Sequence, residues 1–352
     1  MGCFVCGLLL QGCVEGASVR EVPLPSTQSA IKPSPTPSHP AVREETAPPL
    51  QVTYDHGLLS SREIEILGEE KYVFYRELVE NVLQHKTRIL IPEGFRRDKS
   101  FRYVLNLFQK HCPLSYLTGT PYLSLKGDYV VFEYLFSKET HIEKARQLGR
   151  RVENIIQETV REGYSLLEAT LSLYRYLAKT TDYHMQAKST ETYGVLMNQE
   201  GICTGFAYTM ALLLRQAGYD DGYIVAYTPE DPLEEGHAWN VLPFCEKWYH
   251  VDTTWEHSGS FGLSLQYFGM TDAQREADGL MRPFNRDLLE DEPLFVPMCS
   301  DTSFAPIQTA VKYITDFSNH LLYVQTNDGK WLAFHTDTLQ CELTAEPLLS
   351  SQ

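Results

Sequence analysis

The chain lacks most of the features that mark the common functional classes. It has no apolar run of about 18–20 residues, the length that a membrane-spanning helix needs. No P-loop, GxGxxG or GxSxG stretch occurs, so nucleotide binding and serine-hydrolase chemistry are unsupported. The eight cysteines show neither the spacing of a disulfide framework nor the paired CxxC pattern of a zinc site.

Positive charge is also scarce. The chain has 30 Lys and Arg against 46 Asp and Glu, a formal net charge of -16, and no basic run occurs. This balance argues against nucleic acid or an anionic lipid surface as a partner. The 352 residues, 43% of them hydrophobic, exceed what one core usually needs. We therefore expect two or three folded units that bind no nucleic acid, nucleotide or cofactor.

The first 50 residues differ in composition from the rest. Residues 3–10 are apolar, and "LQGC" at residues 10–13 resembles the lipobox at which a bacterial lipoprotein is cut before a lipid-bearing cysteine. No Lys or Arg precedes the apolar stretch, so a short buried or frayed N-terminus is the alternative. Residues 14–50, rich in Pro, Ser and Thr, predict a disordered tether. We expect residues 1–13 to be a lipoprotein-type signal segment that leaves lipid on Cys13. The folded chain would then lie on the extracytoplasmic side of a bacterial cell membrane, and this lipid would be its only contact with the membrane.

The remaining residues divide by pattern into three units. Residues 51–140 mix helices and short strands and predict an α/β unit without visible chemistry. Residues 141–300 begin with two helices, the second opened by a capping-box pattern at Ser165 and Glu168. Residues 301–352 predict a small β unit, in which "NDG" at residues 327–329 signals a hairpin turn.

A lone cysteine, Cys203, opens a helical pattern in the middle unit. It shares one predicted buried face with Ala207, Met210, Ala211 and Leu214. In the first turn of a helix, unpaired N–H groups and the helix dipole favour a thiolate. Gly201 and Gly205 would leave room for a substrate backbone. A buried structural cysteine is the alternative.

Two alternating strands follow, around "HAWNV" and "KWYHVD", with a turn predicted at Cys245-Glu246. A hairpin of this register places His237 and Asp252 on one face as cross-strand neighbours. A carboxylate beside an imidazole fixes its tautomer and supports its cation. A His–Asp pair with a purely structural role is the alternative. A zinc site is a further alternative, but Cys245 at the turn would lie far from His237, so we predict no metal.

Three motifs together resemble the transglutaminase-like superfamily, a papain-related cysteine fold. They are "GICTGFA" (Gly201 to Ala207), "HAWN" (His237 to Asn240) and "WYHVDTTW" (Trp248 to Trp255). The resemblance extends more loosely through "YFGMTDAQREADG". It implies an α+β fold, with a core of N-terminal helices and an antiparallel sheet over residues 141–300. The α/β unit precedes this core and the small β unit follows it.

The resemblance also implies acyl chemistry on a protein or peptide substrate. Cys203 would attack an amide and form a thioester, His237 would act as base and then acid, and Asp252 would orient His237. The Cys203 N–H and a second donor would hold the oxyanion. The family takes that donor from upstream of the cysteine, which makes Tyr193 and Gln199 weak candidates.

Some roles stay open at this stage. Trp239 and Trp255 would either line the active site or only pack in the core. The acidic loop at residues 230–235 would select a basic or amine substrate or be only a solvated loop. We expect hydrolysis, as by a peptidase or amidase, with cross-linking to an amine as the alternative. A surface binding or scaffold module that keeps the fold without turnover is a third possibility.

Overall fold

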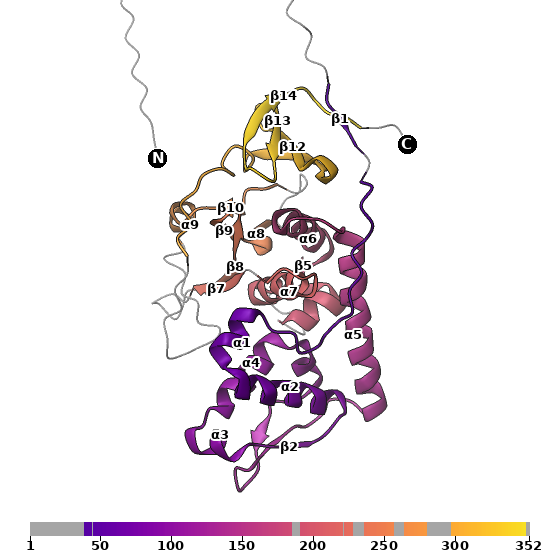
Figure 1. Cartoon of the computed structure of the whole chain (residues 1–352), viewed down its shortest axis with the longest axis vertical. Helices are drawn as coiled ribbons and strands as arrows, with labels where there is room; N and C mark the ends of the chain where they lie inside the picture. Colours follow the sequence, from indigo (N-terminus) through magenta and orange to yellow (C-terminus); the bar gives the residue numbers. More distant parts are fainter. Residues whose placement is uncertain are drawn as a thin grey trace, which may run out of the picture. The chain divides into compact units, whose positions relative to one another are not determined.

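Helices and antiparallel sheets alternate along the folded chain, which confirms the α+β prediction (Figure 1). This computed structural model describes residues 39–43, 45–184, 191–220, 222–227, 236–256, 264–279 and 297–349. The predicted signal segment with Cys13, most of the tether and the acidic loop lie outside these residues. Within the described ranges, no helix is both long and apolar enough to cross a membrane.

The first unit packs helices beside a small sheet. Its elements are α1 (Ser61–Leu67), α2 (Glu69–Leu83), β2 (Arg88–Leu90), α3 (Glu93–Asp98), α4 (Phe101–His111), η1 (Pro113–Leu117), β3 (Tyr122–Leu123) and β4 (Tyr129–Val131). The strands pair antiparallel in the order β2-β4-β3. Helix α4 ends before Cys112, which is extended (φ -97°, ψ 112°), because a residue preceding proline avoids the helical region.

Two helices, α5 (Lys138–Thr159) and α6 (Leu166–Thr180), open the middle unit. The capping box predicted for α6 is present: Glu168 N donates to Ser165 Oγ at 3.3 Å, and Ser165 N donates to Glu168 Oε2 at 2.8 Å. The other carboxylate oxygen, Glu168 Oε1, accepts a bond of 2.7 Å from Thr336 Oγ1. One buried carboxylate therefore caps α6 and joins it to the last unit.

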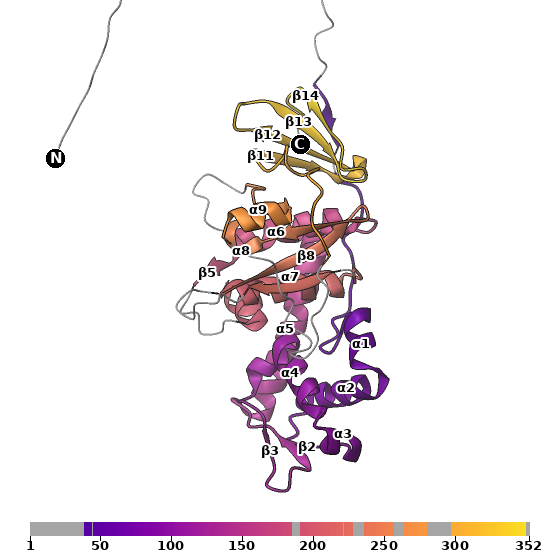
Figure 2. The same cartoon turned by 90° about the vertical axis from the view of Figure 1, so that its left-hand side faces the viewer.

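Helix α7 and a four-stranded antiparallel sheet form the centre of the middle unit. Its further elements are β5 (Asp182–Tyr183), η2 (Gly194–Asn198), β6 (Glu200–Gly201), α7 (Cys203–Gln216), β7 (Tyr223–Tyr227), β8 (His237–Phe244), β9 (Lys247–Val251), α8 (Thr253–Glu256), β10 (Phe268–Met270) and α9 (Asp272–Ala277). The sheet order is β10-β9-β8-β7. Helix α7 packs on β8, where Asn240 Nδ2 donates to Ala207 O at 3.0 Å (Figure 2).

The β8–β9 turn lies at Cys245 and Glu246, as predicted. Both residues have left-handed backbone angles (φ 48° and 64°), and Phe244 pairs with Lys247 across the turn. Two consecutive residues with positive φ are typical of the type I′ turn, which matches the twist of a hairpin. The turn fixes the register, and the register brings the start of β8 beside the end of β9.

The last unit is an antiparallel meander in the order β11-β12-β13-β14. Its elements are β11 (Ala310–Asp316), η3 (Phe317–Asn319), β12 (Leu321–Thr326), β13 (Trp331–His335), β14 (Cys341–Thr344) and β15 (Leu348–Leu349). Strand β1 (Ala41–Val42) pairs parallel with β15, and Val42 packs against Trp331. The folded chain thus begins before residue 51. The tether prediction is wrong over residues 39–43 and 45–50, because their apolar and backbone groups contact the fold.

Candidate active site

Cys203 is the first residue of α7, as the helical pattern predicted. The preceding residue, Ile202, is the N-cap and its side chain makes no capping hydrogen bond. A helix start without a side-chain cap leaves backbone N–H groups available to an anion. The Cys203 side chain is 7% exposed and packs with Ala207 of the same helix and Ala238 of β8.

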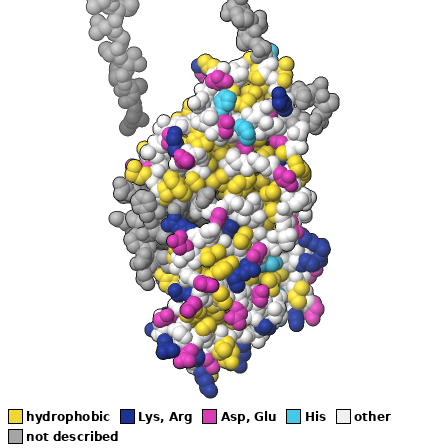
Figure 3. Space-filling model, in the orientation of Figure 1, with side chains coloured by type: hydrophobic (Ala, Val, Ile, Leu, Met, Phe, Trp, Pro, Cys, Tyr) yellow, Lys and Arg dark blue, Asp and Glu magenta, His cyan; other side chains and the backbone are white. Residues whose placement is uncertain are grey.

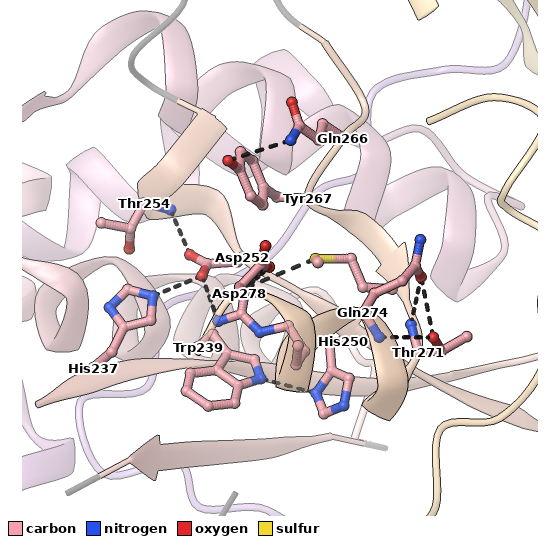
Figure 4. Close-up of polar contacts among 12 residues, drawn as sticks. His237, Trp239, His250, Asp252, Thr254, Gln266, Tyr267, Thr271, Gln274 and Asp278 are labelled. Carbon is pink, nitrogen blue, oxygen red and sulfur yellow. Dashed lines mark hydrogen bonds and ion pairs between the residues drawn. The ribbon is translucent and has the colours of Figure 1, made fainter. Parts of the chain in front are cut away.

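His237 begins β8 and lies between Asp252 and the thiol. Its Nε2 is 2.6 Å from Asp252 Oδ2 (Figure 4). Its side chain also hydrogen-bonds Cys203. Because Nε2 faces the carboxylate, we infer that Nδ1 is the nitrogen left for Cys203. The predicted His–Asp neighbourhood is present, and the helix start brings the cysteine to the same imidazole.

The electrostatics of this group favour a charged imidazole. Burial alone would lower the pKa of His237, but hydrogen bonds to Asp252 and Cys203 raise that pKa to about 9. Burial would likewise raise the pKa of Asp252, yet His237 and Arg275 hold it below its ordinary value. A protonated imidazole at neutral pH is the partner that a cysteine thiolate needs.

Arg275 of α9 is a site residue that the motif reading missed. Its Nη2 donates to Asp252 Oδ2 at 2.9 Å, and its guanidinium lies 4.3 Å and 4.7 Å from the ring centres of Trp239 and Trp255. Its side chain is only 1% exposed. Asp252 Oδ1 accepts a third bond, of 3.1 Å, from the Thr254 N–H. These bonds fix the carboxylate against His237 from two further directions.

The two residues predicted to line the site both contact the imidazole. The Trp255 ring stacks on His237 at 4.9 Å between centres and 15° between planes, and Trp239 stacks at 5.6 Å and 25°. Trp239 is buried at 1% exposure, and its indole N–H donates to His250 Nδ1 at 2.9 Å. Trp239 therefore packs the interior, while its role toward substrate, like that of Trp255, stays a prediction.

Tyr193 and Gln199, the candidates for the second oxyanion donor, lie in different surroundings. Tyr193 is buried against Tyr116 at 4.3 Å between ring centres, and Gln199 is an exposed left-handed residue (φ 58°) after η2. Their proposed role stays a prediction. A Cβ at Gly201 would meet Val195 Cγ2 at 2.6 Å. Val195 therefore leaves no space for a side chain at position 201, while the expectation that Gly201 and Gly205 leave room for a substrate backbone stays a prediction.

A second group of ligand-type side chains, His250, Asp272 and Cys299, brings its ligand atoms within 4.8 Å of one another. Its hydrogen bonds do not suit a metal. His250 Nδ1 accepts from the Trp239 indole, so Nε2 carries the proton and donates to Asp272 Oδ1 at 2.9 Å. The Cys299 N–H donates to Asp272 Oδ2 at 2.9 Å. Neither nitrogen keeps a lone pair for an ion, and burial lowers the pKa of His250.

Comparison with known families identifies the segment that carries this site. The model of the transglutaminase-like superfamily matches residues 153–253. These residues belong to the transglutaminase-like superfamily. The matched segment contains α6, α7 and the β8–β9 hairpin with Cys203, His237 and Asp252. The superfamily generally contains cysteine-dependent enzymes. Arg275 lies beyond the matched segment.

Two solved structures are similar to this chain. One is a candidate cysteine protease from Cytophaga hutchinsonii, with 15% identity, a TM-score of 0.26, and coverage of 31% of this chain and 38% of that chain. The other is named a TGase, with 14% identity, a TM-score of 0.27, and coverage of 52% and 59%. This chain therefore spans less than two thirds of either structure. Comparison with curated proteins gave no match.

Proposed function

We propose that the chain cleaves peptide or amide bonds through a thioester at Cys203. The observation that carries this proposal is the meeting of three groups: a cysteine at a helix start, a buried histidine with a raised pKa, and a buried carboxylate. A structural cysteine would need neither the imidazole nor the carboxylate. The arrangement matches what an activated nucleophile requires, namely a base in contact with it and a third group that orients the base.

The reaction would run in two steps that return the site to its starting state. The Cys203 thiolate adds to the amide carbonyl, the His237 imidazolium gives its proton to the leaving amine, and the C–N bond breaks to leave a thioester. Neutral His237 then takes a proton from water, whose oxygen attacks the thioester and releases the acid. The Cys203 N–H, at the helix start, would hold the oxyanion of each tetrahedral intermediate.

Hydrolysis is the proposed outcome in preference to amine transfer. The segment before His237, "YTPEDPLEEGH", is polar and broken by proline, which gives no sign of a dry lid. Water at roughly 55 M then competes with amines at millimolar levels, and only strong preorganisation for the amine reverses that advantage. The lipobox-like Cys13 and the tether support action at the outer surface of a membrane, with the lipid as anchor.

The test presents candidate surface peptides together with a primary amine and reads both products by mass spectrometry. We expect hydrolysed product in the wild type and none with Cys203→Ala. An excess of amine adduct would assign cross-linking instead. If the wild type forms neither product while it still binds one of the peptides, the chain is a binding module and the proposed chemistry is wrong.

A further inference from the structure

The first unit carries a concentration of positive charge that the whole-chain balance hides. An open cavity of about 480 Å³ is lined by five cations and one carboxylate. The cations are Arg96, Arg97, Lys99, Arg102 and Lys126, and the carboxylate is Glu93. The lining thus has a formal charge of +4 (five minus one) in a chain whose net charge is -16. Glu93 contacts Arg97 at 3.5 Å in an exposed pair, which neutralises little.

Solvent-exposed apolar side chains accompany these cations. Leu125, next to Lys126 in the β3–β4 loop, is fully exposed, and Tyr122 and Leu123 of β3 are also exposed. Leu90 of β2, in the same small sheet, is 57% exposed. In Figure 3, Lys and Arg side chains lie beside apolar ones at the lower end of the face drawn. Contiguous exposed apolar groups rimmed by polar ones mark interaction sites.

The loop that presents Leu125 and Lys126 is held in one conformation. The Gly127 N–H donates to Ser124 O at 2.8 Å, and Gly127 has a left-handed φ of 69° that favours glycine. Ser124 Oγ donates to Asp128 Oδ1 at 2.7 Å, which closes the base of the loop. Because the tip is already ordered, little conformational entropy is lost when it meets a partner.

We propose that this surface docks on an anionic phospholipid bilayer. Leu123 and Leu125 would enter the interface between headgroups and acyl chains, while the cations of the cavity face the lipid phosphates. Apolar insertion and electrostatic attraction to anionic lipid are the two terms that bind peripheral segments to membranes. A soluble polyanion would bind to the cations alone, and its binding would not explain the exposed leucines beside them. The charge match and the exposed leucines together therefore favour the bilayer.

This docking surface is independent of the chemistry at Cys203 and of lipid on Cys13. It also revises the expectation that an acidic chain avoids anionic lipid. That expectation treats the net charge as spread evenly over the surface, whereas screening limits the reach of each charge to about 8 Å in physiological salt. Only the local balance within that distance acts on a lipid headgroup.

The experiment is cosedimentation of the full chain, carrying Cys13→Ser to prevent lipidation, with phosphatidylcholine vesicles with or without phosphatidylglycerol. We expect binding that rises with phosphatidylglycerol. Each of Arg96→Gln and Lys126→Gln should weaken binding about fivefold. Leu125→Asp should weaken it at least as much, by losing insertion and adding a negative charge beside the lipid. The matched controls are Leu343→Asp and Lys312→Gln on the last unit, where both side chains are exposed. These two substitutions should leave vesicle binding unchanged.

Three results overturn the proposal. The first is vesicle binding that does not depend on phosphatidylglycerol, and the second is vesicle binding that falls equally in Leu125→Asp and Leu343→Asp. The third is binding to inorganic polyphosphate that survives Leu125→Asp, with no binding to vesicles, which would make the surface a polyanion site. Leu125→Asn serves as a second variant and removes the apolar contact without adding charge. Far-UV circular dichroism confirms that each variant is folded.

Discussion

Two histidines of the β8–β9 hairpin each pair with an aspartate, and the two pairs behave in opposite ways. His237 on β8 contacts Asp252 at 2.6 Å, and His250 on β9 contacts Asp272 at 2.9 Å. The pKa of His237 is raised to about 9, whereas the pKa of His250 is lowered. The residue types, the sheet that carries both histidines and the burial of both imidazoles are shared, so a carboxylate beside a histidine does not by itself make an acid–base group.

Burial lowers the pKa of both imidazoles, and the partners of the second ring nitrogen then differ. In His237 it meets the Cys203 thiol, which can become an anion, so the protonated ring gains a partner on both sides. In His250 it accepts a hydrogen bond from the Trp239 indole N–H, which only the neutral ring can do. The carboxylates differ as well: Asp252 is fully buried, while the Asp272 side chain is 35% exposed. One pair is therefore suited to move protons, and the other to hold Trp239.

The largest effect should come from removing His237. We expect His237→Ala to lower kcat/KM by about 10² to 10⁴, the usual contribution of general acid–base catalysis. His250→Gln should change kcat/KM by much less, because the hydrogen bonds of His250 go to Trp239 and Asp272 and not to the reacting groups. Steady-state kinetics on a cleaved peptide measure both. Similar losses in the two variants would break the comparison.

Arg275→Met should destabilise the fold strongly, because it leaves Asp252 with only His237 as a charged partner in a buried site. Breaking a buried ion pair costs about 3–5 kcal/mol, measured here as the free energy of unfolding in urea. The exposed pair of Arg146 and Glu143 is the control, and Arg146→Met should cost less than about 1 kcal/mol. Partial recovery in Arg275→Lys is expected. Equal costs for Arg275→Met and Arg146→Met would refute the role assigned to Arg275.

Trp239→Phe should have a smaller effect on stability. It keeps most of the ring but leaves His250 Nδ1 buried without its donor, which costs about 1–3 kcal/mol. A double-mutant cycle with His250→Leu isolates this bond. Coupling is expected between the two substitutions, and strictly additive costs would show that the indole bond contributes nothing.

The pH dependence of stability should differ in sign between the pairs. The stabilisation linked to the raised pKa of His237 is fully present below its ordinary value of 6.5 and is lost as the pH rises through about 9. The stabilisation linked to neutral His250 is present above about 6.5 and is lost as the pH falls below it. Urea denaturation of wild type, His237→Gln and His250→Gln at several pH values measures both differences. Parallel pH trends would contradict the assignment of charge.

The sequence predicted the parts of the site that depend on local pattern. Helical spacing put Cys203 in a first turn, and strand alternation with the turn at Cys245 brought His237 to Asp252. Arg275 could not be predicted, because an arginine in a short amphipathic helix usually faces solvent and only the tertiary fold carries it to Asp252. The parallel pairing of β1 with β15 joins the two ends of the described chain, which no local pattern encodes. The capping residues of α9 in "MTDAQREA" were the available signal for that helix.

The rate of Cys203 alkylation by iodoacetamide tests the central claim most directly, because it needs no substrate. Peptide mapping in wild type and His237→Ala follows Cys203, with the exposed Cys245 as an internal reference. At neutral pH we expect Cys203 to react faster than the other thiols in the wild type, and at least about tenfold slower in His237→Ala, with no change at Cys245. Equal rates at Cys203 in the two proteins would contradict the thiolate–imidazolium pair on which the proposed chemistry rests.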